Sequence, residues 1–227
     1  MWGLSYELLA LIALALISGG IVKGITGLAL PVTSLAITLN FLEPKLCISL
    51  LVLPILVTNA WQAFRTGLSL DLLMRFWLMA CCLVGFLIIS ATIVIELEKN
   101  ILFLCLGLSV AIFASSNLIK PQRQPIKKLT EKILGPIAGI LGGMLGGVST
   151  MWGPPITMFL MLLNLSKDEW IRVVSLIWFL GSIPLTIAYV NNGMLNANTV
   201  PLSIYACIPG MIGIFIGEHI RHKVPQE

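Results

Sequence analysis

The chain carries GGIVKGITGLALP at residues 19–31 and GGMLGGVSTMWGPP at residues 142–155. Both are apolar segments that glycine interrupts and proline closes, and they lie at corresponding places in two halves of the chain. In a membrane protein, such a matched pair is the sequence feature that points most directly to the binding site of a transporter. The pair therefore predicts a transport protein built from two related halves.

The composition is that of a membrane protein. Hydrophobic residues make up 58% of the 227 residues and charged residues 11%, and the mean hydropathy is +1.00. A soluble domain has about 25% charged residues. The apolar runs approach the ~20 residues that a spanning helix needs, and they lack the alternation of barrel strands. We predict an all-α polytopic protein, integral to the cell (inner or plasma) membrane and surrounded by the lipid bilayer.

Nine apolar segments are expected. They lie at 4–22, 25–42, 46–64, 72–95, 100–118, 133–147, 150–165, 171–190 and 199–217. The first two form one apolar region broken around Lys23-Gly24, and the sixth and seventh form another broken around Gly146-Gly147. These four pieces are short for membrane spans, which predicts tilted half-helices or tight hairpins. Interrupted helices therefore stand at the start of each half.

Comparison of the chain with itself favours an internal duplication. The pairs that match at an offset of 123 residues are Gly20 with Gly143, Gly24 with Gly147, Thr26 with Ser149 and Pro31 with Pro154. At an offset of 126 residues, Ser49 falls on Ser175. We predict two transmembrane repeats of about five helical segments each, at 1–118 and 133–227, joined by a basic linker at 119–132.

Lysine and arginine set the orientation of a membrane protein. The linker holds five of them, at Lys120, Arg123, Lys127, Lys128 and Lys132, so we expect it on the cytoplasmic side. Five segments separate one half from the next. Because five is odd, the second half enters the membrane upside down, which predicts inverted-topology repeats. The second half ends before a counterpart of segment 100–118, so its last helix is expected to be absent.

These features resemble the TauE/SafE family of membrane permeases, often called sulfite exporters. The resemblance rests on the paired Gly-rich, Pro-ended segments, the basic linker and the run GMIGIFIG at 210–217. It covers nearly the whole chain. It implies transport of small sulfur-containing anions such as sulfite, thiosulfate or organosulfonates. The absent final helix departs from the family's pattern.

The two helix breaks supply a predicted anion site. A half-helix N-terminus offers unpaired N–H donors and about half a positive charge, and neighbouring hydroxyls add further donors. The candidate substrate-binding residues are Lys23, Gly24, Thr26, Gly27, Pro31, Asn59, Gly147, Ser149, Thr150, Trp152 and Pro154. In the alternative interpretation, the glycines serve close helix packing and the hydroxyls bond back to their own helices.

Lys23 is the charged member of this set. An ionisable residue at membrane depth is a functional hypothesis by default, and here it gives the anion site one positive charge. Its matched residue is Gly146, so Lys23 also breaks the symmetry between the halves. The alternative is a lysine at the cytoplasmic end of the first segment that snorkels to the lipid headgroups. Trp152 is open to two interpretations as well, as a lining or gating residue and as an interfacial anchor.

We therefore predict a secondary transporter of small sulfur-containing anions that works by alternating access, with protons as potential co-substrates. Two alternatives stay open, a non-transporting scaffold or assembly subunit and, with less support, a membrane redox protein. The redox protein needs a ligand cluster, but the histidines are His219 and His222 and the five cysteines are scattered. We predict no enzyme activity, no catalytic residues, no metal, no cofactor and no nucleic-acid partner. The sequence is compatible with an oligomer.

Overall fold

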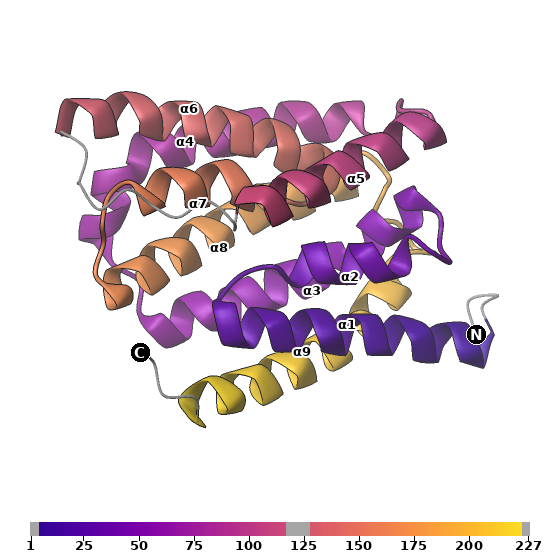
Figure 1. The fold of residues 1–227 in the computed structure, drawn as a ribbon. Coiled ribbons are helices and arrows are strands. Elements are labelled where there is room, and N and C mark those ends of the chain that lie inside the picture. Colours follow the sequence, from indigo (N-terminus) through magenta and orange to yellow (C-terminus); the bar gives the residue numbers. More distant parts are fainter. Residues whose placement is uncertain (1–4, 117–127, 224–227) are drawn as a thin grey trace.

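The computed structural model describes residues 5–116 and 128–223, and these residues contain nine α-helices (Figure 1). Their bounds are α1 Tyr6–Thr26, α2 Leu30–Thr38, α3 Pro44–Thr66, α4 Leu70–Ile93, α5 Lys99–Ser116, α6 Lys128–Ser149, α7 Gly153–Met161, α8 Lys167–Asn191 and α9 Val200–Lys223. Six of them, α1, α3, α4, α6, α8 and α9, are long and apolar enough to cross a membrane. The all-helical prediction is confirmed for the described residues.

The two interruptions lie a few residues later than the sequence predicts. The predicted positions of the breaks, around Lys23-Gly24 and Gly146-Gly147, are wrong, because α1 continues to Thr26 and α6 continues to Ser149. The glycines inside these helices are used for close packing and do not end them. Each helix ends where the backbone turns left-handed, at Gly27 after α1 and at Thr150 after α6.

Proline starts the short helix after each break. Pro31 and Pro154 lie in the first turns of α2 and α7, which are 9 residues long. A proline is tolerated in a first turn because the N–H that it lacks has no partner within the helix. The predicted half-helices are therefore α2 and α7, whereas α1 and α6 have 21 and 22 residues.

Helix α1 lies against α9 (Figure 1). Glycines of both helices form the seam between them. A Cβ atom added to Gly20 would lie 2.9 Å from the Cα atom of Gly213, and one added to Gly24 would lie 2.9 Å from the Cα atom of Gly217. These distances are shorter than real Cβ contacts. The two backbones therefore approach as closely as small residues allow.

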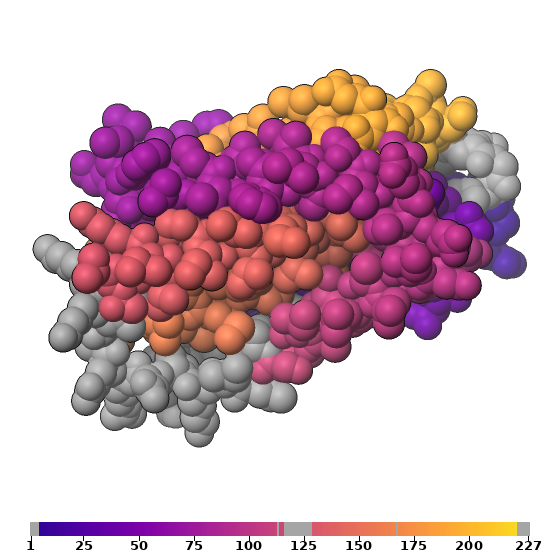
Figure 2. All heavy atoms as spheres, turned by 90° about the horizontal axis from the view of Figure 1, so that it is seen from above, coloured from indigo at the N-terminus to yellow at the C-terminus, as the bar shows by residue number. Residues whose placement is uncertain are grey.

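Helix α6 packs against α4 in a similar way. A Cβ atom added to Gly143 would lie 2.6 Å from the Leu83 carbonyl oxygen and 2.8 Å from the Leu87 nitrogen. The Ser90 hydroxyl crosses this seam and donates to the Gly143 carbonyl at 2.8 Å. Figure 2 shows α4, α5 and α6 side by side on one face of the molecule. Large apolar side chains of these helices, among them Leu104 and Leu141, are exposed, as expected of a surface that faces lipid.

Helices α3 and α8 contact one another at the centre of the bundle, and α3 also packs on α9 and α8 on α4. They are the most buried of the six candidate spans.

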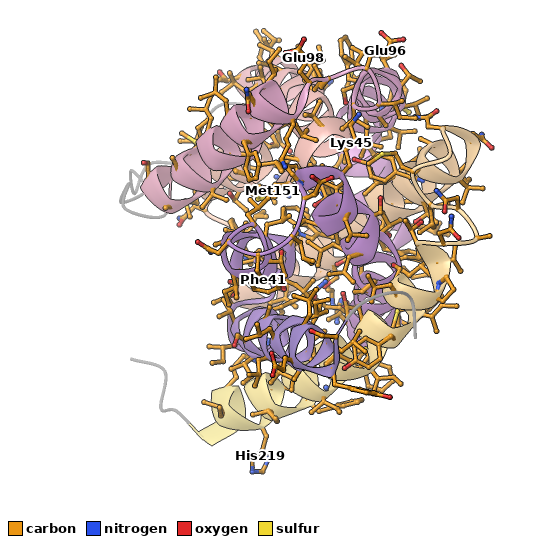
Figure 3. The ribbon with its side chains drawn as sticks, turned by 90° about the vertical axis from the view of Figure 1, so that its right-hand side faces the viewer. Phe41, Lys45, Glu96, Glu98, Met151 and His219 are labelled. Carbon is orange, nitrogen blue, oxygen red and sulfur yellow. The ribbon has the colours of Figure 1, made fainter. Side chains whose placement is uncertain are left out.

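Ion pairs tie the helices together near their ends. Arg65 of α3 pairs with Glu218 of α9, and Arg75 of α4 pairs with Glu131 of α6. Figure 3 looks onto the opposite end, where Lys45 donates to the Ile95 carbonyl oxygen at 2.6 Å. Residues 119–127 of the predicted basic linker 119–132 lie outside the described residues.

Candidate functional site

A small cavity lies between the two helix breaks, and we call it the central cavity. Its lining residues are Lys23, Ala29, Leu30, Pro31, Val32, Ile55, Asn59, Thr150, Met151, Trp152, Gly153 and Trp178. Figure 3 labels Met151 in the interior of the bundle, at the second break. The volume of the central cavity is about 20 Å³, which is room for about one water molecule. The fold therefore brings both breaks to one interior point, beside α3 and α8.

Lys23 is buried at this point, in the last turn of α1, with 3% of its surface exposed. Its ammonium donates to Thr58 Oγ1 at 3.0 Å and to Asn59 Oδ1. A lysine has three N–H donors, so one remains. No acidic side chain pairs with Lys23 anywhere in the described part of the chain. The ammonium points inward to α3, and neutral acceptors hold it in place.

The orientation of Asn59 is itself fixed. Its amide nitrogen donates to the Trp178 carbonyl oxygen at 3.1 Å, across the contact between α3 and α8. The amide oxygen is therefore the atom that faces Lys23. One N–H of the amide is bonded to α8, and its second N–H remains available as a donor.

Two donors at the second break have no partner within the described residues. They are Thr150 Oγ1 and Trp152 Nε1, and both atoms are buried. Leaving such a donor unsatisfied costs about 1–3 kcal/mol, so an unpartnered buried donor in a native structure needs an explanation. Both residues line the central cavity. An acceptor bound there would satisfy these donors.

The backbone of Thr150 is strained. Its φ angle is 61°, and a β-branched residue rarely adopts this left-handed region. Its N–H donates to the Gly146 carbonyl oxygen at 2.8 Å and ends α6. Strained residues of this kind cluster at ligand sites.

The indole of Trp152 occupies space that two glycines leave open. A Cβ atom added to Gly146 would lie 3.0 Å from the Trp152 Cβ atom, and one added to Gly181 would lie 3.2 Å from Cε2. The Trp178 ring lies next to it, with ring centroids 6.4 Å apart. Trp152 is thus an interior residue of the cavity wall.

Six of the residues predicted from the sequence lie outside the central cavity. These are Gly24, Thr26, Gly27, Gly147, Ser149 and Pro154. Thr26 is exposed, and its hydroxyl donates to the Val22 carbonyl at 2.8 Å. The Ser149 hydroxyl donates to the Leu145 carbonyl at 2.7 Å. These two hydroxyls bond back to their own helices, as in the alternative interpretation of the sequence.

The remaining predicted residues have packing or capping contacts. Gly24 and Gly147 lie in the seams of α1 with α9 and of α6 with α4. The Gly27 carbonyl accepts a hydrogen bond from Gln62 Nε2 at 3.2 Å. Pro154 is buried in the first turn of α7.

A second cavity, which we call the vestibule, leads from Lys23 toward the helix ends that carry Arg65 and Glu218. Its volume is about 390 Å³, and its lining residues are Lys23, Gly24, Gly27, Gln62, Arg65, Thr66, Asp168, Ile171, Arg172, Ile214, Glu218 and Arg221. Lys23 lines both cavities and lies at their junction. Four basic side chains and two acidic ones therefore line the path to the central cavity.

The sequence alone did not identify Thr58, Trp178, Arg172 or Arg221 as part of this region. Thr58 neighbours Asn59, and its polar side chain inside an apolar span is a signal that was available. The contribution of Trp178 is its backbone carbonyl, which no residue type reveals. Arg172 and Arg221 reach the vestibule through the packing of α8 and α9 around α3.

The family model of the sulfite exporter TauE/SafE family matches residues 11–227. No curated protein and no solved structure matches the chain. The matched region includes both helix breaks and every residue that lines the two cavities. With six membrane-capable helices, the chain is a multi-pass integral membrane protein of a transporter family. It belongs to the TauE/SafE sulfite exporter family.

Proposed function

We propose that the protein transports small sulfur-containing anions and that the central cavity is its substrate site. One observation carries this proposal: the buried ammonium of Lys23 meets two buried, unpartnered donors, Thr150 Oγ1 and Trp152 Nε1, at one cavity. None of the residues that line this cavity is a carboxylate. Ionised oxyanions only accept hydrogen bonds, so a site made of donors and one cation fits them. The family supports sulfur as the central atom.

We also propose that the two halves, 1–118 and 133–227, are inverted repeats joined by the linker 119–132. The helix pairs support this, because α1 packs on α9 and α6 packs on α4, which is the exchange that a two-fold axis between the halves requires. The register supports it too. Gly20 lies on Gly213 in one seam and Gly143 lies on Leu87 in the other. Gly20 corresponds to Gly143 at the offset of 123 residues, and Leu87 corresponds to Gly213 at the offset of 126 residues.

The proposed mechanism is alternating access about this axis. The vestibule reaches Lys23 from one side of the protein, and the positive-inside rule makes that side cytoplasmic. The central cavity is too small for an oxyanion in this state, so the walls at Trp152 and Pro31 must separate when substrate enters. The two seams of glycines favour movement of α1 with α9, and of α4 with α6, as units. Protons remain potential co-substrates.

The helix breaks favour transport over a non-transporting scaffold. A scaffold has no need for a strained Thr150, or for a lysine buried without a counter-charge. Natural proteins keep such features where they serve a site.

Flux through the purified protein tests the proposal. The full chain is reconstituted in proteoliposomes, and uptake of sulfite, thiosulfate and methanesulfonate is followed, with acetate as the carboxylate control. We expect saturable uptake of at least one sulfur oxyanion, faster than in protein-free vesicles. Repeating the assay with an imposed pH gradient measures proton coupling. Uptake equal to that of empty vesicles for every sulfur anion overturns the proposal.

A further inference from the structure

We infer that the central cavity selects singly charged anions over doubly charged ones, and that its substrate is a monoanion with an apolar side, such as bisulfite or a small sulfonate. This inference rests on the proposed function, since it assigns the charge state of the anion that the same cavity holds. It separates anions that the family name does not distinguish. Three features of the cavity carry it: its charge, its donors and its apolar wall.

The charge of the central cavity is a single positive charge. Of the twelve residues that line it, all within the described ranges, Lys23 alone ionises. A monoanion beside this ammonium gives a neutral pair. A dianion leaves one negative charge without compensation in the protein interior, where an unpaired buried charge is strongly unfavourable. The site therefore favours the singly charged form of any anion that has two forms.

The donors of the central cavity fit an oxyanion. They include the remaining N–H of Lys23, the hydroxyl of Thr150 and the indole N–H of Trp152. Asn59 lines the same cavity, and one N–H of its amide group donates to the Trp178 carbonyl, so the second N–H remains available as a donor.

The rest of the wall is apolar. Leu30, Val32, Ile55 and Met151 line the central cavity, together with Trp178. A methyl group or the bare sulfur of a three-oxygen anion can pack against this wall, because neither group needs a hydrogen bond. A buried oxygen there would lose its hydrogen bonds to water without replacement.

The vestibule, which Lys23 also lines, contains other charged residues. They are Arg65 of α3, Asp168 and Arg172 of α8, and Glu218 and Arg221 of α9, with Gln62 as a neutral neighbour. Arg65 pairs with Glu218. The arginines attract anions, whereas the carboxylates of Asp168 and Glu218 repel them. His219 lies in a surface pocket with Trp61 and Phe215, and Arg65 and Glu218 line both this pocket and the vestibule.

Binding to the purified full chain in lipid nanodiscs, measured by isothermal titration calorimetry, tests the inference. The probes are methanesulfonate, which is singly charged at every pH used, and sulfate, which is doubly charged. We expect methanesulfonate to bind at least about tenfold more tightly than sulfate at pH 7. Equal or tighter binding of sulfate overturns charge selection and leaves the proposed transport intact. If neither these anions nor sulfite bind, the proposed function fails as well.

Sulfite supplies a second readout, because sulfite and bisulfite interconvert near neutral pH. The affinity for sulfite relative to methanesulfonate should rise between pH 8 and pH 6, in step with the bisulfite fraction. Methanesulfonate corrects for any titration of the protein itself, and His219→Gln serves as a background that removes the nearby histidine. A ratio that is constant or falls over this range contradicts the inference.

Asn59→Asp tests the role of net charge at nearly constant shape. The new carboxylate faces Lys23 in place of the amide oxygen and neutralises the site, so methanesulfonate should bind at least about tenfold more weakly. Asn59→Ala removes the amide without adding charge and should weaken binding less. Thermal unfolding verifies that both variants are folded. If either variant is not folded, the comparison of methanesulfonate with sulfate on the native chain still tests the selection of singly charged anions. Unchanged affinity in folded Asn59→Asp contradicts the inference.

Discussion

Thr150 holds the same left-handed turn as Gly27. Their φ angles are 61° and 84°, and each N–H donates to the carbonyl four residues earlier, at 2.8 Å to Gly146 and at 2.7 Å to Lys23. Glycine adopts this turn without strain because it has no Cβ atom. Threonine does so at a cost, and its hydroxyl lies buried without a partner at the central cavity. The costly residue is therefore the one that can serve a ligand.

Replacing this threonine should separate stability from function. Thr150→Gly removes the backbone strain, which is about 1–2 kcal/mol for a left-handed residue, and we expect the melting temperature to hold or rise. The same change deletes a donor, so sulfite flux should fall about tenfold, as expected for a hydrogen bond to a charged group. Thermal unfolding and proteoliposome flux measure the two effects. Gly27→Ala is the control, since it adds strain at the matched turn and should lower stability. Full flux in Thr150→Gly would exclude the hydroxyl from the site.

The indole N–H of Trp152 can be removed by a change to the smaller ring of phenylalanine. Trp152→Phe should weaken anion binding by about tenfold, because it deletes an unsatisfied donor, and it should lower stability because the buried indole is only partly replaced. Calorimetric titration and thermal unfolding check this. Trp61→Phe, at a position that is 39% exposed on α3, is the matched control and should bind as the native protein does. Identical affinities for the two variants would argue against a donor role for Trp152.

The seams of glycines should tolerate no added methyl group. Gly24→Ala and Gly143→Ala place a Cβ atom within 3 Å of the facing helix, and such overpacking costs about 1–3 kcal/mol. Gly85→Ala and Gly107→Ala are controls, because no atom lies within 4 Å of the added Cβ atom. In a helix, Gly→Ala at such open sites is favourable by about 0.5–1 kcal/mol. Thermal unfolding should therefore move in opposite directions for the two pairs, and a common direction would contradict the packing model.

The vestibule should speed the capture of anions through its charge. Arg172→Gln removes a cation that lines it, so the apparent affinity for sulfite should fall several-fold at low salt. The difference should shrink at high salt, because the Debye length falls from about 10 Å at 0.1 M to about 3 Å at 1 M ionic strength. Arg172→Lys keeps the charge and should behave as the native protein. Flux measured at both ionic strengths tests this, and a defect that salt does not alter would point to a direct contact instead.

Much of the fold could be predicted from the sequence, because long apolar runs leave few alternatives to membrane helices. The two interruptions could be located only to within a few residues. A glycine such as Gly24 looks the same whether it ends a helix or lets another backbone approach, and the position of α9 decides between these uses. Ser149 and Thr150 are chemically alike and adjacent, yet the first bonds back to α6 and the second turns away from it. That difference arises from the left-handed φ angle of Thr150.

The depth of Lys23 could not be predicted either. Its distance from the start of α1 is that of a residue near the membrane surface if the helix runs straight across. Instead its ammonium reaches Thr58 and Asn59 of α3 in the interior. The matched residue Gly146 leaves space for the Trp152 ring, so the two halves fill equivalent places with a cation and an aromatic ring. Only the packed structure reveals this exchange.

The initial rate of sulfite flux in proteoliposomes that contain Lys23→Gln tests the central proposal most directly. This variant keeps a long polar side chain but removes the positive charge of the site. We predict a fall in kcat/KM of about 10- to 100-fold, which corresponds to the loss of about 1.5–3 kcal/mol for a hydrogen bond to a charged group. Lys45→Gln, at the opposite end of the molecule, should keep the native rate. An unchanged rate in folded Lys23→Gln would contradict the placement of the anion between the two helix breaks.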